Sequence, residues 1–152
     1  MDNLADKKME LLFPSSARKA LYRGRCQSIV PPTSTYGACL RRGCAAEMLW
    51  IAEDGTNKSF KQSNGHPLWN CSGTPGDCGC PHAELRCLLH HETKDARDAV
   101  LLVTLSPCAA CAWAIVHDDP RRIHSVFFLT EYDKDPRGTR ILQRFGIRAE
   151  VL

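Results

Sequence analysis

Residues 99–105, Ala-Val-Leu-Leu-Val-Thr-Leu, constrain the fold of this chain more than any other segment. Successive side chains of a strand point to opposite faces of a sheet, so a continuous apolar run requires both faces to be covered. We therefore expect 99–105 to be a buried central strand. Ser106 and Pro107 follow directly and predict a new helix, with Ser106 as its cap.

The rest of the chain predicts an alternation of helices and strands around this segment. Asp54-Gly55 is a hairpin turn signal, and Gly146 is a helix stop. The order predicts one α/β domain over 1–152, with a central mixed five-stranded sheet and helices on both faces. Residues 1–35 have the weakest pattern. The expected elements are helices at 4–13 and 17–22, strands at 48–51 and 58–64, a helix at 81–91, strand 99–105, a helix at 107–117, a strand at 123–129, a helix at 136–145 and a strand at 147–152.

Nine cysteines in 152 residues are an unusual and odd number. The N-terminus lacks the apolar segment of a signal peptide, and no apolar run reaches the roughly 18 residues that a membrane span needs. We therefore expect a cytoplasmic protein without a disulfide framework. The formal net charge of +3 is too small to indicate a nucleic-acid-binding surface.

Two motifs at the starts of consecutive predicted helices can hold a metal ion. Cys108 and Cys111 are three residues apart, so they share a face near a helix N-terminus, where thiolates are stabilised. His82 supplies a third ligand. Two thiolates and one imidazole suit Zn²⁺, and in a catalytic site the fourth position belongs to water. Glu84, two residues after His82, is placed to move the protons of that water.

Cys-x-x-Cys alone does not decide the chemistry, because redox pairs and structural zinc sites share it. His82-x-Glu84 followed by Pro107-Cys108-x-x-Cys111 is the motif of zinc-dependent nucleobase deaminases, in which the glutamate is an acid and base and not a ligand. A non-catalytic zinc module is the alternative. Four protein ligands on the metal would favour it, since a catalytic site keeps one position open.

On these residues the chain resembles the cytidine/deoxycytidylate deaminase superfamily, and within it the deoxycytidylate (dCMP) deaminases, including those of bacteriophages. Residues 103–112 are similar to the zinc segment of that family almost throughout. The resemblance covers about residues 39–152. Further matching positions are Cys39-Leu40-Arg41, Asn64-Gly65-His66-Pro67, Tyr132, Gly138, Leu142, Gly146 and Ile147.

The resemblance implies a three-layer cytidine-deaminase-like fold and hydrolytic deamination of dCMP to dUMP with release of ammonia. It also implies a homo-oligomer, a hexamer in that family, with a small nucleotide as its ligand and no membrane partner. Asn64 would bond the sugar, and Tyr132 would flank the base or sugar. Backbone groups of Ala83 and Ser106 would read the cytosine edge.

Arg86 departs from the family, in which dCMP deaminases usually have Asn at this position. The longer hairpin and the cysteine-rich loop at 65–80 also depart from it. The nucleotide and any control by dCTP or dTTP therefore stay open. A modified cytosine nucleotide, a nucleoside, a free base and an adenosine in RNA are alternative substrates.

Cys71, Cys78 and Cys80 precede the predicted catalytic helix, and with one further ligand they could bind a second, structural zinc. Their alternative role is as plain loop thiols, with Cys39, Cys44 and Cys87 as small buried side chains. Several arginines are candidates for a substrate phosphate, although most are expected on the surface. These are Arg41, Arg121, Arg122, Arg137 and Arg140.

Overall fold

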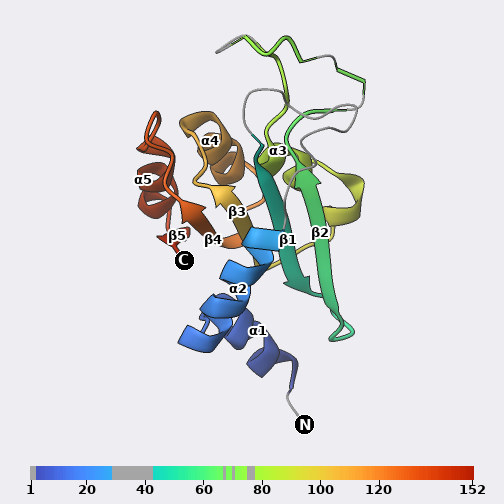
Figure 1. Cartoon of the computed structure of the whole chain (residues 1–152). Helices are drawn as coiled ribbons and strands as arrows, with labels where there is room; N and C mark the ends of the chain where they lie inside the picture. The colour runs from blue at the N-terminus through green and yellow to red at the C-terminus, as the bar shows by residue number, and fades with distance from the viewer. Residues whose placement is uncertain (1–2, 29–42, 67, 70, 75–77) are drawn as a thin grey trace.

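A five-stranded sheet in the order β2-β1-β3-β4-β5 forms the centre of the molecule (Figure 1). This computed structural model describes residues 3–28, 43–66, 68–69, 71–74 and 78–152. The predicted α/β fold with a mixed sheet is confirmed, because β1 runs opposite to the other four strands. β1 (Ala45–Ile51) pairs antiparallel with β2 (Asn57–Ser63) and β3 (Ala99–Leu105), and β4 (Ile123–Thr130) is parallel to β3 and to β5 (Arg148–Val151).

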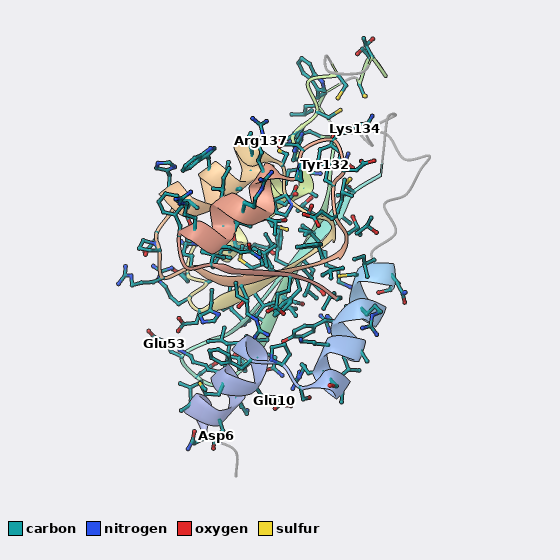
Figure 2. The ribbon with its side chains drawn as sticks, turned by 90° about the vertical axis from the view of Figure 1, so that its left-hand side faces the viewer. Asp6, Glu10, Glu53, Tyr132, Lys134 and Arg137 are labelled. Carbon is teal, nitrogen blue, oxygen red and sulfur yellow. The ribbon has the colours of Figure 1, made fainter. Side chains whose placement is uncertain are left out.

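Helices cover both faces of the sheet. Figure 2 shows the two N-terminal helices on one side of the sheet and the helices that follow β3 and β4 on the other. No helix of the described residues is both long and apolar enough to cross a membrane. The helices are α1 (Leu4–Leu12) and α2 (Ser16–Ser28) on one face, and α3 (Ala83–Leu88), α4 (Ala109–His117) and α5 (Arg137–Arg144) on the other, with a short 3₁₀ helix at His91–Thr93.

β3 is the central strand that its apolar run predicts. Leu101 and Val103 pack into the cluster under α3, α4 and α5, whereas Val100 and Leu102 pack into the cluster under α1 and α2. All four side chains are almost completely buried. Alternation along one strand thus connects the apolar layers on the two faces of the sheet.

β2 is an edge strand and its side chains are mostly exposed. Lys58 lies opposite Trp50 and Lys61 lies opposite Glu47 in the register with β1. Trp50 belongs to the cluster under α3, whereas Lys61 Nζ lies 3.6 Å from a carboxylate oxygen of Glu47 on the other face. The edge therefore carries one ammonium group toward each face of the sheet.

The helix predicted at 81–91 is shorter than expected. α3 ends at Leu88, and Leu89, expected on its apolar face, is 75% exposed. The buried Thr93 hydroxyl donates to the Cys87 carbonyl (2.6 Å). In a longer helix this carbonyl would accept a backbone N–H of the next turn instead. The prediction was therefore wrong at the C-terminal turn, and α2 extends six residues beyond the predicted end at residue 22.

The loops that form the candidate site lie together at one end of the strands. The carboxyl ends of β3 and β4 lie there. The antiparallel strand β1 begins at the same end, and β2 ends there. The Gly65 N–H donates to the Pro81 carbonyl (3.0 Å), which brings the start of α3 to this end of the strands. Ligand sites of open α/β sheets commonly form outside such carboxyl ends.

Candidate metal centre and active site

His82, Cys108 and Cys111 lie together at the end of the strands where α3 and α4 begin. His82 Nδ1 lies 3.2 Å from Cys111 Sγ and 3.6 Å from Cys108 Sγ. All three ligand atoms lie within 4.8 Å of one another. The structure thus brings together three residues that are separated by up to 29 positions in the sequence.

The local backbone explains why the two sulfur atoms point to one place. Cys108 is the N-cap of α4 with extended backbone angles (φ −70°, ψ 171°), and Cys111 lies in the first turn. The prediction of Ser106 as the cap is wrong. Its hydroxyl instead accepts the Tyr132 N–H (2.7 Å), so Ser106 connects the β3–α4 loop to the loop after β4.

The three residues fit a zinc ion by distance and by chemistry. Tetrahedral zinc, with bonds of about 2.3 Å to sulfur and about 2.0 Å to nitrogen, separates an N and an S ligand by about 3.5 Å. The measured N···S distances of 3.2 and 3.6 Å lie on either side of that value. Two soft sulfur atoms and one imidazole nitrogen bind zinc in preference to magnesium or calcium, which prefer oxygen ligands.

The two thiols lie in hydrogen-bond contact and shift each other's pKa in opposite directions. The hydrogen bond from Cys111, with a second from His82, lowers the pKa of Cys108 to about 4. The same bond to Cys108, together with burial, raises the pKa of the Cys111 thiol. The bond to Cys108 also raises the pKa of His82. Zinc binds cysteine as the thiolate, so the affinity of these three residues for the metal would depend on pH.

Glu84 lies in the first turn of α3, beside the three ligands, and is only 7% exposed. Burial raises the pKa of its carboxyl group, because the charged form loses its hydration. A carboxyl group that takes up a proton more readily than usual is suited to general acid and base chemistry near neutral pH.

A cavity of about 210 Å³ opens beside this cluster. It is lined by the four residues that the sequence predicts to contact the base and sugar, and these come from four different segments of the chain. The Asn64 amide oxygen accepts the Cys44 N–H (2.9 Å), which fixes the side chain at the end of β2. The predicted residues that line the cavity are Asn64, His82, Ala83, Glu84, Ser106, Cys108 and Tyr132.

Lys134 also lines the cavity, and sequence reasoning missed it. Figure 2 shows Tyr132, Lys134 and Arg137 together at one end of the molecule. Lys134 belongs to a charged turn without a motif. Only its position shortly after a parallel strand could have indicated a role, because ligands commonly bind outside the carboxyl ends of such strands.

Four of the arginines proposed for a phosphate are not among the residues that line this cavity. Arg122 is buried and donates to the Leu88 and Thr93 carbonyls (3.0 and 2.7 Å), so its candidacy as a phosphate ligand is wrong. Arg121 and Arg137 form ion pairs with Asp119 and Asp135. Arg140 is exposed on α5. Arg41 lies outside the described residues.

Cys71, Cys78 and Cys80 form a second cluster, with all three sulfur atoms within 4.8 Å of one another. The Gly73 N–H donates to Cys71 Sγ (3.4 Å). Cys78 and Cys80 also line the cavity beside His82. Of the other cysteines, Cys26 and Cys87 are buried, as predicted for Cys87. Cys39 lies outside the described residues.

Solved structures of deaminases share the fold. The dCMP deaminase of the cyanophage S-TIM5, in its apo form, is 21% identical, with a TM-score of 0.62 over 91% of this chain and 99% of that chain. The same enzyme in complex with dCMP and dUMP gives a TM-score of 0.66 at 21% identity, over 91% and 98% of the two chains. Rib2 deaminase of Aspergillus oryzae, in complex with DARIPP, gives 0.53 at 19% identity, over 88% and 82%.

No curated protein sequence matches this chain. Residues 31–129 match the cytidine and deoxycytidylate deaminase zinc-binding region, which is well over half of the chain and includes His82, Glu84, Cys108 and Cys111. The match agrees with the resemblance drawn from the motifs and with the fold of the solved deaminases. The chain belongs to the cytidine and deoxycytidylate deaminase family.

Proposed function

We propose that this protein catalyses the zinc-dependent hydrolytic deamination of dCMP to dUMP, with release of ammonia. The observation that carries the proposal is the buried Glu84 carboxyl beside His82, Cys108 and Cys111, in a cavity large enough to admit a pyrimidine ring. A zinc ion held by the three ligands supplies Lewis acidity that makes water a nucleophile near pH 7.

Glu84 moves the protons of the reaction. Its carboxylate accepts a proton from the attacking water and delivers it to N3 of the cytosine ring as the bond from oxygen to C4 forms. A second proton then passes to the amino group on C4, the C4–N bond breaks, and ammonia leaves. Water and dCMP thus become dUMP and ammonia without any further reactant.

The walls of the cavity supply the groups that orient the substrate. The backbone of Ala83 and Ser106 reads the polar edge of cytosine, and both residues are almost fully buried. Tyr132 flanks the base or sugar, and Asn64 bonds the sugar. Support for a pyrimidine nucleotide comes from the cyanophage enzyme of the same fold, whose structure contains dCMP and dUMP.

Lys134 favours a nucleotide over a nucleoside. It is the one cationic side chain besides His82 among the described residues that line the cavity, and it is exposed to solvent. An exposed ammonium group at the opening can bind a phosphate without the cost of burying a charge.

The proposal is tested by measuring ammonia release from dCMP, dCTP, CMP, deoxycytidine, their 5-substituted forms, cytosine and an adenosine-containing RNA. We expect dCMP to react fastest. Glu84→Gln should lower kcat by at least about 10²–10⁴-fold while zinc remains bound, since this residue is not a ligand. A rate on dCMP far below that on another substrate would reassign the substrate, and activity retained in Glu84→Gln would refute the assignment of Glu84.

Lys134→Ala tests the phosphate contact. We expect a higher KM for dCMP and unchanged kinetics for deoxycytidine, which has no phosphate. Lys94→Ala is the matched control, because Lys94 is an exposed lysine that does not line the cavity. Equal effects on both substrates would contradict the assignment.

We also propose a second zinc bound by Cys71, Cys78 and Cys80. Their mutual distances support a common metal, and the Trp69 indole N–H donates to the Cys78 carbonyl (2.7 Å), which holds the loop at this point. Gly79 has a left-handed φ of +69° and packs against the Trp69 ring, where a β-carbon would overlap it. These two contacts fix Cys78 and Gly79 against Trp69.

The metal content decides between a second zinc and plain loop thiols. We expect two zinc ions per chain in the parent protein, one in Cys80→Ser, and two in Cys26→Ser, because Cys26 is a buried residue of α2 and belongs to neither cluster. One zinc in the parent protein would refute the second site. Assembly into a homo-oligomer and a cytoplasmic location stay predictions.

A further inference from the structure

The helix that carries both zinc-ligand cysteines does not cap itself. Cys108 occupies the N-cap of α4, but its side chain makes no capping hydrogen bond. Its sulfur instead lies 3.6 Å from His82 Nδ1. Helices usually satisfy their first N–H groups with a Ser, Thr, Asp or Asn at this position. The use of Cys108 for the metal therefore leaves the start of α4 in need of another acceptor.

Asp135 supplies that acceptor from a different loop. A carboxylate oxygen of Asp135, 26 residues further along the chain, accepts the Ala109 N–H at 2.9 Å. The other oxygen accepts from Arg137 Nε at 2.7 Å. A charged acceptor at a helix N-terminus forms a stronger bond than a neutral one and also interacts favourably with the helix dipole.

Two further contacts fix the loop of Asp135 against the start of α4. The Tyr132 N–H donates to the Ser106 hydroxyl (2.7 Å). Gly138 lies so close to the Pro107 carbonyl that a β-carbon on it would overlap the oxygen. The loop after β4 and the first turn of α5 therefore contact residues 106, 107 and 109, on both sides of Cys108.

We infer that Asp135 is a positioning residue for the zinc site, acting through the N-terminus of α4. By accepting the Ala109 N–H, its carboxylate holds the first turn of the helix in the orientation that directs Cys108 and Cys111 at His82. The same loop carries Tyr132 and Lys134, so one short segment both orients the metal ligands and lines the substrate cavity. The inference rests on the proposed function, because it assumes that these three residues bind zinc.

The test is the zinc affinity of Asp135→Ala, measured by competition with a chromogenic chelator, which does not require activity. We expect the zinc dissociation constant to rise by about 10–100-fold, the usual effect of losing a residue that orients a metal ligand. Asp135→Asn keeps an acceptor oxygen and should recover most of the affinity. In the Co²⁺-substituted protein, the absorption bands of the site should shift in Asp135→Ala and not in Asp135→Asn.

Asp119→Ala is the matched control. Asp119 also pairs with an arginine two residues later and accepts that residue's N–H (3.0 Å), but it lies after the C-terminus of α4. We expect its zinc affinity to equal that of the parent protein. Parent-like affinity in Asp135→Ala, or an equal loss in Asp119→Ala, would overturn the inference. A parent protein that binds zinc and deaminates none of the substrates would refute the proposed function alone.

Discussion

At the scale of single residues, β1 buries one acidic side chain among its apolar ones. Glu47 is completely buried on β1, and Arg25 of α2 donates to both of its carboxylate oxygens (2.7 and 3.0 Å). The sequence prediction began this strand at 48, because a glutamate interrupts the apolar run. The partner that makes Glu47 acceptable lies 22 residues away in the sequence, which no local pattern reveals.

Arg25→Ala should destabilise the fold by about 3 kcal/mol, because it leaves the Glu47 carboxylate buried without its main partner. The measurement is the free energy of unfolding in urea. Arg18→Ala is the control on the same helix. Its partner Glu10 is exposed, so its loss should cost about 0.5 kcal/mol. Equal losses in the two variants would show that burial of Glu47 has no special weight.

At the scale of elements, the site depends on how closely α5 approaches the loop before α4. Gly138 lies in α5 and its backbone packs directly on the Pro107 carbonyl. A residue with a side chain would push the two elements apart at the position next to Cys108. The sequence identifies Gly138 only through the family resemblance, since a helix pattern by itself disfavours glycine.

Gly138→Ala should destabilise the protein by about 1–3 kcal/mol through overpacking and should weaken zinc binding as well. Gly24→Ala, in helix α2, introduces a β-carbon with nothing within 4 Å of it. We expect that change to stabilise the protein by about 0.5–1 kcal/mol, since alanine is the better helix former. Thermal unfolding and zinc affinity measure both effects. A neutral Gly138→Ala would contradict the close approach.

At the scale of the whole molecule, the apolar core and the metal centre are separate. Two apolar clusters cover the two faces of the sheet. His82 and Cys108 lie beyond the ends of the strands and belong to neither cluster. The continuous apolar layers on both sides of β3 should therefore fold without metal.

Removal of zinc with a chelator should leave the far-UV circular dichroism close to that of the loaded protein. The melting temperature should fall by about 5–10 °C, because bound metal stabilises only the folded state. Added Zn²⁺ should restore it and Mg²⁺ should not, since thiolates bind magnesium weakly. Loss of the secondary structure on chelation would show that the core depends on the metal.

The fold class, the order of the elements and the grouping of His82, Glu84, Cys108 and Cys111 could be predicted because each leaves a local pattern. Apolar runs mark the strands, and the spacing of the cysteines marks a shared helix face. Contacts between distant loops leave no such pattern. The wrong cap at Ser106 and the missed Lys134 and Asp135 all belong to the contact between the β3–α4 loop and the loop after β4.

The lysines of the edge strand β2 have a consequence for the behaviour of the protein at high concentration. An unpaired strand edge can add a strand from another molecule, and this is a common start of aggregation. Lys58 and Lys61 direct ammonium groups to opposite faces of the sheet, so an added strand would meet a charge on either side. Pairing between two copies of β2 would bring like charges together. The two lysines thus oppose edge-to-edge aggregation, a protection that neither the core nor the metal centre supplies.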